Sequence, residues 1–303
     1  MIPLLRRRLP CSSSLQPYLQ KIDANGQYSN FGPLHSELRT ILGLRYSAND
    51  DEIVLASSAT SALSLCILYY KQFAGSQQFN VLMPSWTFAA TAQCALSLGC
   101  QICFADVDTE GMLDIDLLEE QLLLGGLQDI DLILTVVPFG RKYDPRQWEE
   151  FSKRCGKPVI IDCAAGFSSA KLSELATVVS THATKFFPTG EGGFVISKNK
   201  TLCQYVRAAS NFGFAGTRTS SIVGFNAKLS EYHAAIGLAY AEHMLEDSER
   251  RYVEQFEAYS AFLEDSLVMI FPNSSWMPVS TNSVSNNVEQ AGFSLDYLSQ
   301  VLL

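Results

Sequence analysis

Three groups of residues in this chain of 303 amino acids carry side chains that could act in one reaction. The first is Lys185, within the segment STHATKFFPTGEGGF (180–194), where three glycines follow the lysine. Phosphate-binding P-loops place their glycines before the lysine and a Ser or Thr directly after it, so the order here argues against a P-loop. Beside Phe186, Phe187 and Pro188, Lys185 is either a surface residue or a desolvated amine suited to forming a Schiff base.

The second group is the segment SSATSAL (57–63), which places hydroxyls and small side chains at the expected start of a helix. Unpaired N–H groups and the helix dipole favour an anion such as phosphate at this position. Ser and Thr are also common helix caps without any ligand. The segment alone is therefore compatible with a phosphate site and with an ordinary cap.

The third group is Asp162, which ends the apolar run of VIIDCAA (159–165). Because burying an unpaired carboxylate is costly, Asp162 is either a cap or loop residue, or the partner of a buried cation. That cation could be a metal or a protonated ring nitrogen. The sequence places no further carboxylates or histidines beside it. The pair Cys100 and Cys103 has zinc-knuckle spacing but lacks a second pair of ligands. We therefore expect no metal site.

The elements that must position these groups alternate along the chain. Apolar runs predict strands at 52–57, 79–84, 101–107, 131–138 and 158–164. Helical patterns lie between them at 60–73, 88–99, 114–126 and 144–156. Continuously apolar strands are typical of a mostly parallel sheet with helices on both faces. Two short strands then flank the Lys185 segment, and helices are expected at 199–211 and roughly 228–266. Ligands of such sheets bind at the carboxyl ends of the strands, where all three groups are expected to lie.

Composition limits the class of protein further. The net charge of −9, from 22 basic and 31 acidic residues, argues against non-specific nucleic-acid binding. The hydrophobic fraction of 47% and the charged fraction of 17% are typical of a soluble globular protein. No apolar run reaches the ~18 residues of a membrane span, and no apolar signal-peptide segment follows the arginines at 6–8. We expect a cytoplasmic protein with neither a nucleic-acid nor a membrane partner.

A phosphate site, a buried aspartate and a lysine, in this order on an α/β sheet, are the parts that pyridoxal 5'-phosphate requires. The sequence resembles the DegT/DnrJ/EryC1/StrS family of PLP-dependent sugar aminotransferases, which have fold type I. The resemblance rests on an ordered set of blocks: YSNFGPL (28–34), SSATSAL, MPSWTFAAT (83–91), FADVD (104–108), VVPFG (136–140), VIIDCAAGF (159–167), STHATKFFPTGEGG (180–193) and GFNAKLSEYHAAIG (224–237). Each block is weak alone, whereas the ordered set is highly specific.

The resemblance implies roles around the cofactor ring. Lys185 matches the lysine that bonds to the cofactor aldehyde, and Asp162 matches the aspartate that faces the pyridine nitrogen. Phe88 matches the aromatic residue that stacks on the ring, with Trp86 as the alternative. The glycines at 190, 192 and 193 match the turn behind the lysine. Lys185 and Asp162 are therefore the expected catalytic residues.

The resemblance also implies a phosphate site shared between two subunits. Ala59 and Thr60 match the turn that holds the phosphate, and Ser180 matches a second phosphate ligand. Asn226 matches an asparagine that reaches the phosphate from the neighbouring subunit. A homodimer with shared active sites follows as an expectation.

The implied fold is a fold type I transferase with a mostly parallel, seven-stranded-type sheet flanked by helices. We expect a large cofactor-binding domain at 15–245 and a small C-terminal α/β domain at 246–303, joined by residues 1–14. This small domain is shorter than is usual in the family. Ala165 stands where the family usually has Gln or His, and Lys228 stands where it often has Arg.

The implied activity is transfer of an amino group from an amino acid, expected to be L-glutamate, to a keto-sugar. The sugar is expected to be nucleotide-linked and to serve surface-polysaccharide or secondary-metabolite biosynthesis. One alternative is a non-catalytic or regulatory binding protein of this fold, which Ala165 and the short C-terminus favour. Another is a PLP- or PMP-dependent sugar dehydratase, against which Lys185 argues, because that reaction replaces the lysine with histidine.

Overall fold

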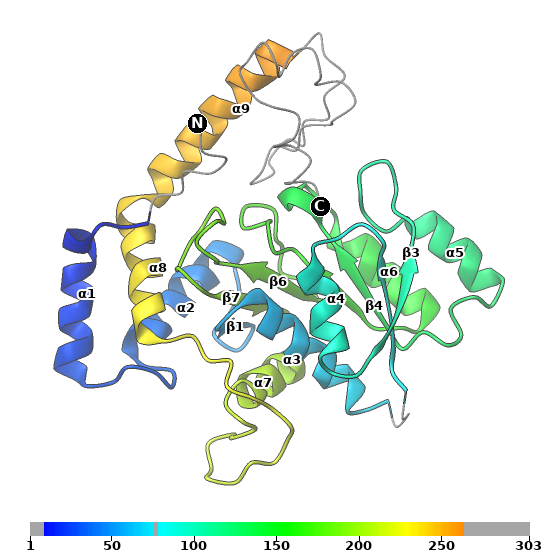
Figure 1. Ribbon diagram of the computed structural model, residues 1–303, viewed down its shortest axis with the longest axis horizontal. Coiled ribbons are helices and arrows are strands. Elements are labelled where there is room, and N and C mark those ends of the chain that lie inside the picture. The colour runs from blue at the N-terminus through cyan, green and yellow to red at the C-terminus, as the bar shows by residue number, and fades with distance from the viewer. Residues whose placement is uncertain (1–8, 75–77, 264–303) are drawn as a thin grey trace.

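The computed structural model describes residues 9–74 and 78–263. In this part of the chain, seven strands form one sheet in the order β1-β7-β6-β5-β4-β2-β3 (Figure 1). The strands are β1 (Ile53–Ala56), β2 (Asn80–Pro84), β3 (Gln101–Ala105), β4 (Leu132–Val136), β5 (Val159–Asp162), β6 (Ala176–Ser180) and β7 (Gly193–Ile196). β7 is antiparallel to both of its neighbours, and the other pairs are parallel. The expected mostly parallel α/β sheet is confirmed.

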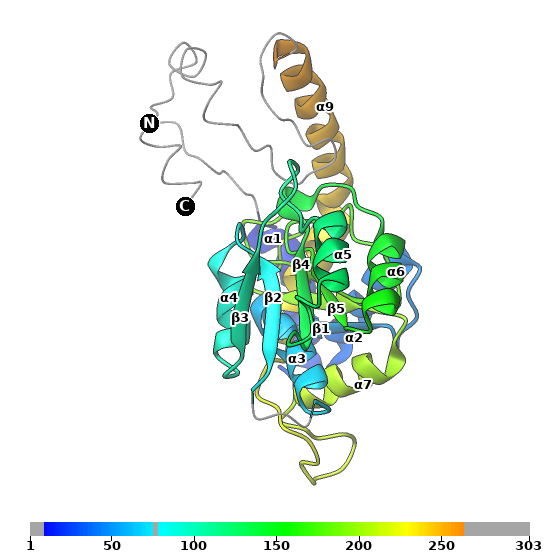
Figure 2. The same cartoon turned by 90° about the vertical axis from the view of Figure 1, so that its right-hand side faces the viewer.

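Helices enclose the sheet on both faces. One face carries α1 (Ser12–Asn25), α2 (Pro33–Tyr46), α5 (Ile115–Leu123), α6 (Pro145–Cys155) and α8 (Glu231–His243). The other carries α3 (Ala59–Lys71), α4 (Ala89–Leu96) and α7 (Lys200–Ala209). Figure 2 shows α4 on one side of the strands and α5 and α6 on the other.

Alternate strand residues serve the two cores. In β1, Ile53 and Leu55 pack toward α2, whereas Val54 and Ala56 pack toward α3. Successive side chains of a strand point to opposite faces, so a strand covered on both faces must be apolar throughout. This explains the continuous apolar runs.

Three features differ from the expectations. β3 is partly exposed, with Phe104 60% exposed, because it forms the edge of the sheet. The helix expected at 228–266 is two helices, α8 and α9 (Leu245–Leu263), which separate at Met244 where φ is −134°. α8 begins late because Ser230 caps it by accepting a hydrogen bond from His233 N–H. Helices α1 and α2 precede the first expected strand and were not predicted.

The expected small domain falls mostly outside the described residues. Of residues 246–303, the structure describes those up to 263, which belong to α9. Figure 1 shows α9 in orange, projecting away from the sheet. The boundary at 245 therefore stays a prediction, and the polar tail from residue 272 lies outside the described part.

Candidate active site

The three groups of residues meet at one edge of the sheet. Ala56, the last residue of β1, pairs with Gly193, the first residue of β7, and Gly193 also pairs with Ser180, the last residue of β6. The segments that follow β1 and β6 therefore leave the sheet on either side of Gly193. Asp162 ends the next strand, β5. The carboxyl ends of the parallel strands thus gather the predicted groups, as the sequence indicated.

The start of α3 offers the features of a phosphate cradle. Ser58 caps the helix, accepting a hydrogen bond from Ser61 N–H at 3.0 Å. Ala59 and Thr60 therefore occupy the first turn, whose N–H groups have no acceptor within the helix. A Cβ atom on Gly193 would lie 2.5 Å from the backbone nitrogen of Ala59. Gly193 thus lets β7 approach this turn closely, which places the turn beside Ser180.

Asp162 is a buried carboxylate, only 5% exposed. Its Oδ2 accepts a hydrogen bond from Thr91 Oγ1 at 2.8 Å, and its Oδ1 accepts one from Ala164 N–H at 3.0 Å. Burial raises the pKa of Asp162, while these two donors and the positive charge of Lys185 act in the opposite direction. Each oxygen can accept another hydrogen bond. The site therefore suits a further cationic donor, such as a protonated ring nitrogen.

Thr91 is a site residue that the sequence reasoning missed. It lies in α4, and its N–H donates to the carbonyl oxygen of Phe88 at 3.0 Å. Thr87 Oγ1 donates to Thr91 Oγ1 at 2.8 Å, so a chain of hydroxyls ends on Asp162. The one sequence signal was a hydroxyl on a mostly apolar helix.

Phe88 presents an exposed ring at the start of α4. It is the N-cap residue, 80% exposed, and lies one helical turn before Thr91. Its position near the Asp162 partner is compatible with the predicted stacking role. Trp86 instead packs against Phe139 with ring centroids 5.6 Å apart, and a Cβ on Gly111 would lie 2.5 Å from its ring. These contacts favour packing as the role of Trp86.

Lys185 lies in a turn that apolar side chains anchor. Its N–H donates to the carbonyl oxygen of His182 at 2.8 Å, and its side chain is half-buried. The next two residues, Phe186 and Phe187, are buried, and Phe187 stacks on Phe167 with ring centroids 4.6 Å apart. Gly190 turns the chain back with φ of +89°, a conformation that other residues rarely adopt. The lysine therefore stands on a loop with a buried base.

Asn226 is exposed and bonded to a neighbouring lysine. Lys228 Nζ donates to Asn226 Oδ1 at 2.9 Å and to Asn211 Oδ1 at 2.8 Å. Burial lowers the pKa of Lys228. The adjacent Ala227 accepts a hydrogen bond from Ser57 N–H at 2.7 Å, which joins this segment to the start of α3. The expected contribution of Asn226 to a second subunit stays a prediction.

Residues 9–74 and 78–263 contain no cluster of three or more His, Cys, Asp or Glu side chains that could hold a metal ion. Within the same residues, no helix combines the length and the apolar character needed to cross a membrane. Cys100 and Cys103 are free thiols.

The fold and the edge site define a class of protein. A mostly parallel sheet with helices on both faces is the fold that this chain shares with PLP-dependent aminotransferases of known structure. A model of the DegT/DnrJ/EryC1/StrS aminotransferase family matches residues 12–291, and the chain belongs to this family.

Individual relatives agree with this assignment. The chain is 33% identical to protein Rv3402c of Mycobacterium tuberculosis over 78% of its own length and 59% of the relative. It is 30% identical to the dTDP-4-amino-4,6-dideoxy-D-glucose transaminase of Shigella dysenteriae, over 78% of the chain and 63% of the relative. The crystal structure of a proposed PLP-dependent aminotransferase from Bacillus cereus superposes with a TM-score of 0.81 at 25% identity, covering 96% of this chain and 83% of the other.

The chain spans only part of the length of these curated relatives, 59% of one and 63% of the other.

Proposed function

We propose that this protein is a PLP-dependent aminotransferase that moves an amino group from an amino acid, L-glutamate, to a nucleotide-linked keto-sugar. The observation that carries the proposal is the buried Asp162 carboxylate, held by Thr91 and Ala164 and within the electrostatic reach of Lys185. Such a carboxylate suits a cation that enters from outside the chain. Family membership supports the activity, and the name of the Shigella relative supports the sugar class.

The described residues fit pyridoxal phosphate at three points. The first turn of α3, with Ala59 and Thr60, and the neighbouring Ser180 would hold the phosphate. Asp162 would hold the proton on the ring nitrogen, and Phe88 would cover the ring. When bound, the cofactor supplies an aldehyde that takes up amines and a ring that withdraws electrons from the adjoining carbon.

Lys185 is proposed to have two tasks. Its Nζ would hold the cofactor at its aldehyde. Once free, the same amine would act as a base that takes a proton from the α-carbon of the amino donor and later gives that proton back. Asp162 assists by keeping its partner cation protonated in a buried site, where charge interactions are strong.

A homodimer with shared sites is proposed as the working form. Two large aromatic side chains near the predicted site, Phe88 and Trp86, are 80% and 42% exposed. Exposed apolar surface of this kind is typical of protein interfaces. In such a dimer Asn226 would reach the phosphate of the second copy. We place the reaction in surface-polysaccharide or secondary-metabolite sugar biosynthesis.

The test is spectroscopic. Protein incubated with pyridoxal phosphate and desalted should keep visible absorbance, and L-glutamate should bleach it. Nucleotide-linked keto-sugars added to the bleached protein should restore it, and a panel of such sugars would identify the substrate. Colourless protein after desalting would contradict the proposal. Absorbance that persists but never responds to glutamate would favour a binding protein of the same fold.

A further inference from the structure

Lys185 lies in the turn that connects two hydrogen-bonded arms of chain. We call residues 181–192 the lysine loop. Its arms are joined by backbone hydrogen bonds from Thr189 to Thr181 at 2.7 Å, from Ala183 to Gly190 at 2.7 Å, and from Thr181 to Gly192 at 2.9 Å. The hydroxyls of Thr181 and Thr189 are buried and lie 2.7 Å apart. The base of the loop is therefore closed by backbone and buried hydroxyls.

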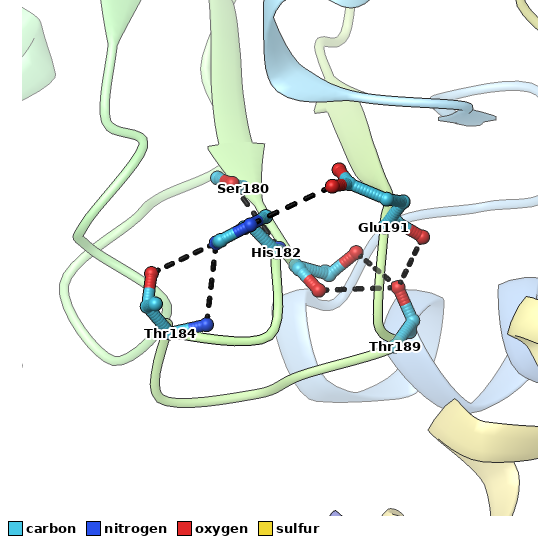
Figure 3. A network of polar contacts seen from close by, with 6 residues as sticks. Ser180, His182, Thr184, Thr189 and Glu191 are labelled. Carbon is cyan, nitrogen blue, oxygen red and sulfur yellow. Dashed lines mark hydrogen bonds and ion pairs between the residues drawn. The ribbon is translucent and has the colours of Figure 1, made fainter. Parts of the chain in front are cut away.

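His182 makes a second closure nearer to Lys185. Its Nδ1 lies 2.9 Å from Thr184 Oγ1 and accepts a hydrogen bond from Thr184 N–H at 3.3 Å (Figure 3). A backbone N–H can only donate, so Nδ1 must carry the lone pair. The proton of the neutral ring then lies on Nε2. A side chain that accepts from the backbone N–H two residues on is the arrangement by which Asn and Asp stabilise turns.

The other ring nitrogen faces the opposite arm. His182 Nε2 lies 3.5 Å from Glu191 Oε1, and Figure 3 shows the ring between Thr184 and Glu191. The two side chains are 43% and 61% exposed, so the pair adds little stability as an ion pair. Its contribution is geometric, because one rigid ring contacts both arms.

We propose that His182 is a positioning residue for Lys185. The turn from His182 to Lys185 is closed by a backbone hydrogen bond between these two residues, at 2.8 Å. The His182 ring accepts a hydrogen bond from Thr184 N–H within the same turn, and its Nε2 contacts Glu191 on the opposite arm. The direction in which the lysine amine leaves the loop is thereby fixed before any cofactor binds. The inference rests on the role proposed for Lys185, but its test concerns the loop in cofactor-free protein.

The first test determines the tautomer. The chain has four histidines, so ¹⁵N labelling of histidine gives four ring systems. The His182→Asn variant identifies the signals of His182 by their loss. The Nε2–H tautomer is expected in the wild-type protein at a pH where the ring is neutral. The Nδ1–H tautomer would overturn the proposal, because Thr184 N–H would then face a donor.

The second test is hydrogen exchange of the Ala183 and Lys185 amides in cofactor-free protein. His182→Ala should speed exchange about tenfold, which corresponds to about 1.4 kcal/mol. His182→Asn should speed it less, because the Asn oxygen can still accept from Thr184 N–H. Glu191→Ala probes the bridge from the other arm, and does so even if the His182 variant fails to fold. Glu191→Gln should stay near wild type, because its amide oxygen can take the place of Oε1 opposite Nε2.

The chain offers a matched control in His243. Its Nε2 lies 3.6 Å from Glu242 Oε2, and its side chain is 43% exposed, as is that of His182. His243→Ala should leave exchange in the lysine loop unchanged. Unchanged exchange in both His182→Ala and Glu191→Ala, or an equal increase in the control, would refute the positioning role. Because no cofactor or substrate is present, failure of the aminotransferase proposal would leave these exchange results unaffected.

Discussion

Gly193→Ala tests the phosphate cradle by a defined displacement. The added Cβ would lie 2.5 Å from Ala59 N, 2.8 Å from Ala59 Cα and 2.9 Å from the carbonyl carbon of Ser58. Ordinary van der Waals contact begins at 3.4 Å, so the Cβ and the nearest backbone atom, at 2.5 Å, must move about 0.9 Å further apart. All three neighbours are backbone atoms, which cannot rotate away. β7 and the start of α3 must therefore move apart.

This displacement should affect stability and cofactor binding together. Overpacking of this kind costs about 1–3 kcal/mol of unfolding free energy. A shift of roughly 0.9 Å would also stretch hydrogen bonds from the first turn of α3 to a phosphate beyond the usual range. Losing one hydrogen bond to a charged group costs about 1.5–3 kcal/mol, which weakens cofactor binding by about 10- to 100-fold.

The assay combines urea unfolding of the cofactor-free protein with titration of pyridoxal phosphate by visible absorbance. Gly156→Ala is the control, because Gly156 follows α6 with φ of +66° and an added Cβ would contact nothing within 4 Å. It should lose about 1 kcal/mol of stability through backbone strain alone and bind cofactor normally. If Gly193→Ala bound cofactor as tightly as wild type, the start of α3 would not be the phosphate site.

Two further perturbations separate charge from packing. Asp162→Asn should raise the unfolding free energy of cofactor-free protein by about 1 kcal/mol at neutral pH. Burial raises the pKa of Asp162, so the folded protein loses stability as this carboxyl ionises with rising pH, and the neutral amide avoids that loss. The same variant should slow amino transfer at least about 100-fold in half-reaction kinetics, and a parallel loss of stability and rate would contradict this reasoning. His35→Leu should flatten stability against pH on the acid side. Burial, with Arg207 and Arg39 nearby, lowers the pKa of His35 from 6.5 to about 3, so wild-type stability is complete above 6.5 and falls toward 3 by at most about 5 kcal/mol. Urea titrations at several pH values would measure this, and an unchanged acid slope in the variant would exclude His35 as its cause.

The sequence located the site because parallel strands place their carboxyl ends at one edge. Asp162 and Ser180 end strands, and Ala59 follows one, so their meeting required only the sheet. Local sequence patterns were not enough to predict the hydrogen-bond partner of Asp162. Thr91 reaches it only because α4, which packs on α3 and β3, brings this hydroxyl to the end of β5, a tertiary relation that local periodicity does not contain.

Among the glycines and helix ends, some features could be predicted from the sequence and others depend on tertiary packing. The positive φ of Gly190 agrees with the expected turn behind the lysine, whereas the close approach of Gly193 to Ala59 depends on the register between β1 and β7. The separation of α8 from α9 at Met244 carries no Gly or Pro, so the composition gave no sign of it. These features follow from packing between distant segments.

The role proposed for Lys185 can be tested by identifying the lysine that holds the cofactor. Protein loaded with pyridoxal phosphate is reduced with borohydride, digested and analysed by mass spectrometry, with Lys185→Ala as the control. The reduced cofactor is expected on the peptide containing Lys185 and is expected to be absent from that peptide in the control. Attachment to another lysine, or retained visible absorbance with no label on Lys185, would show that Lys185 does not hold the cofactor.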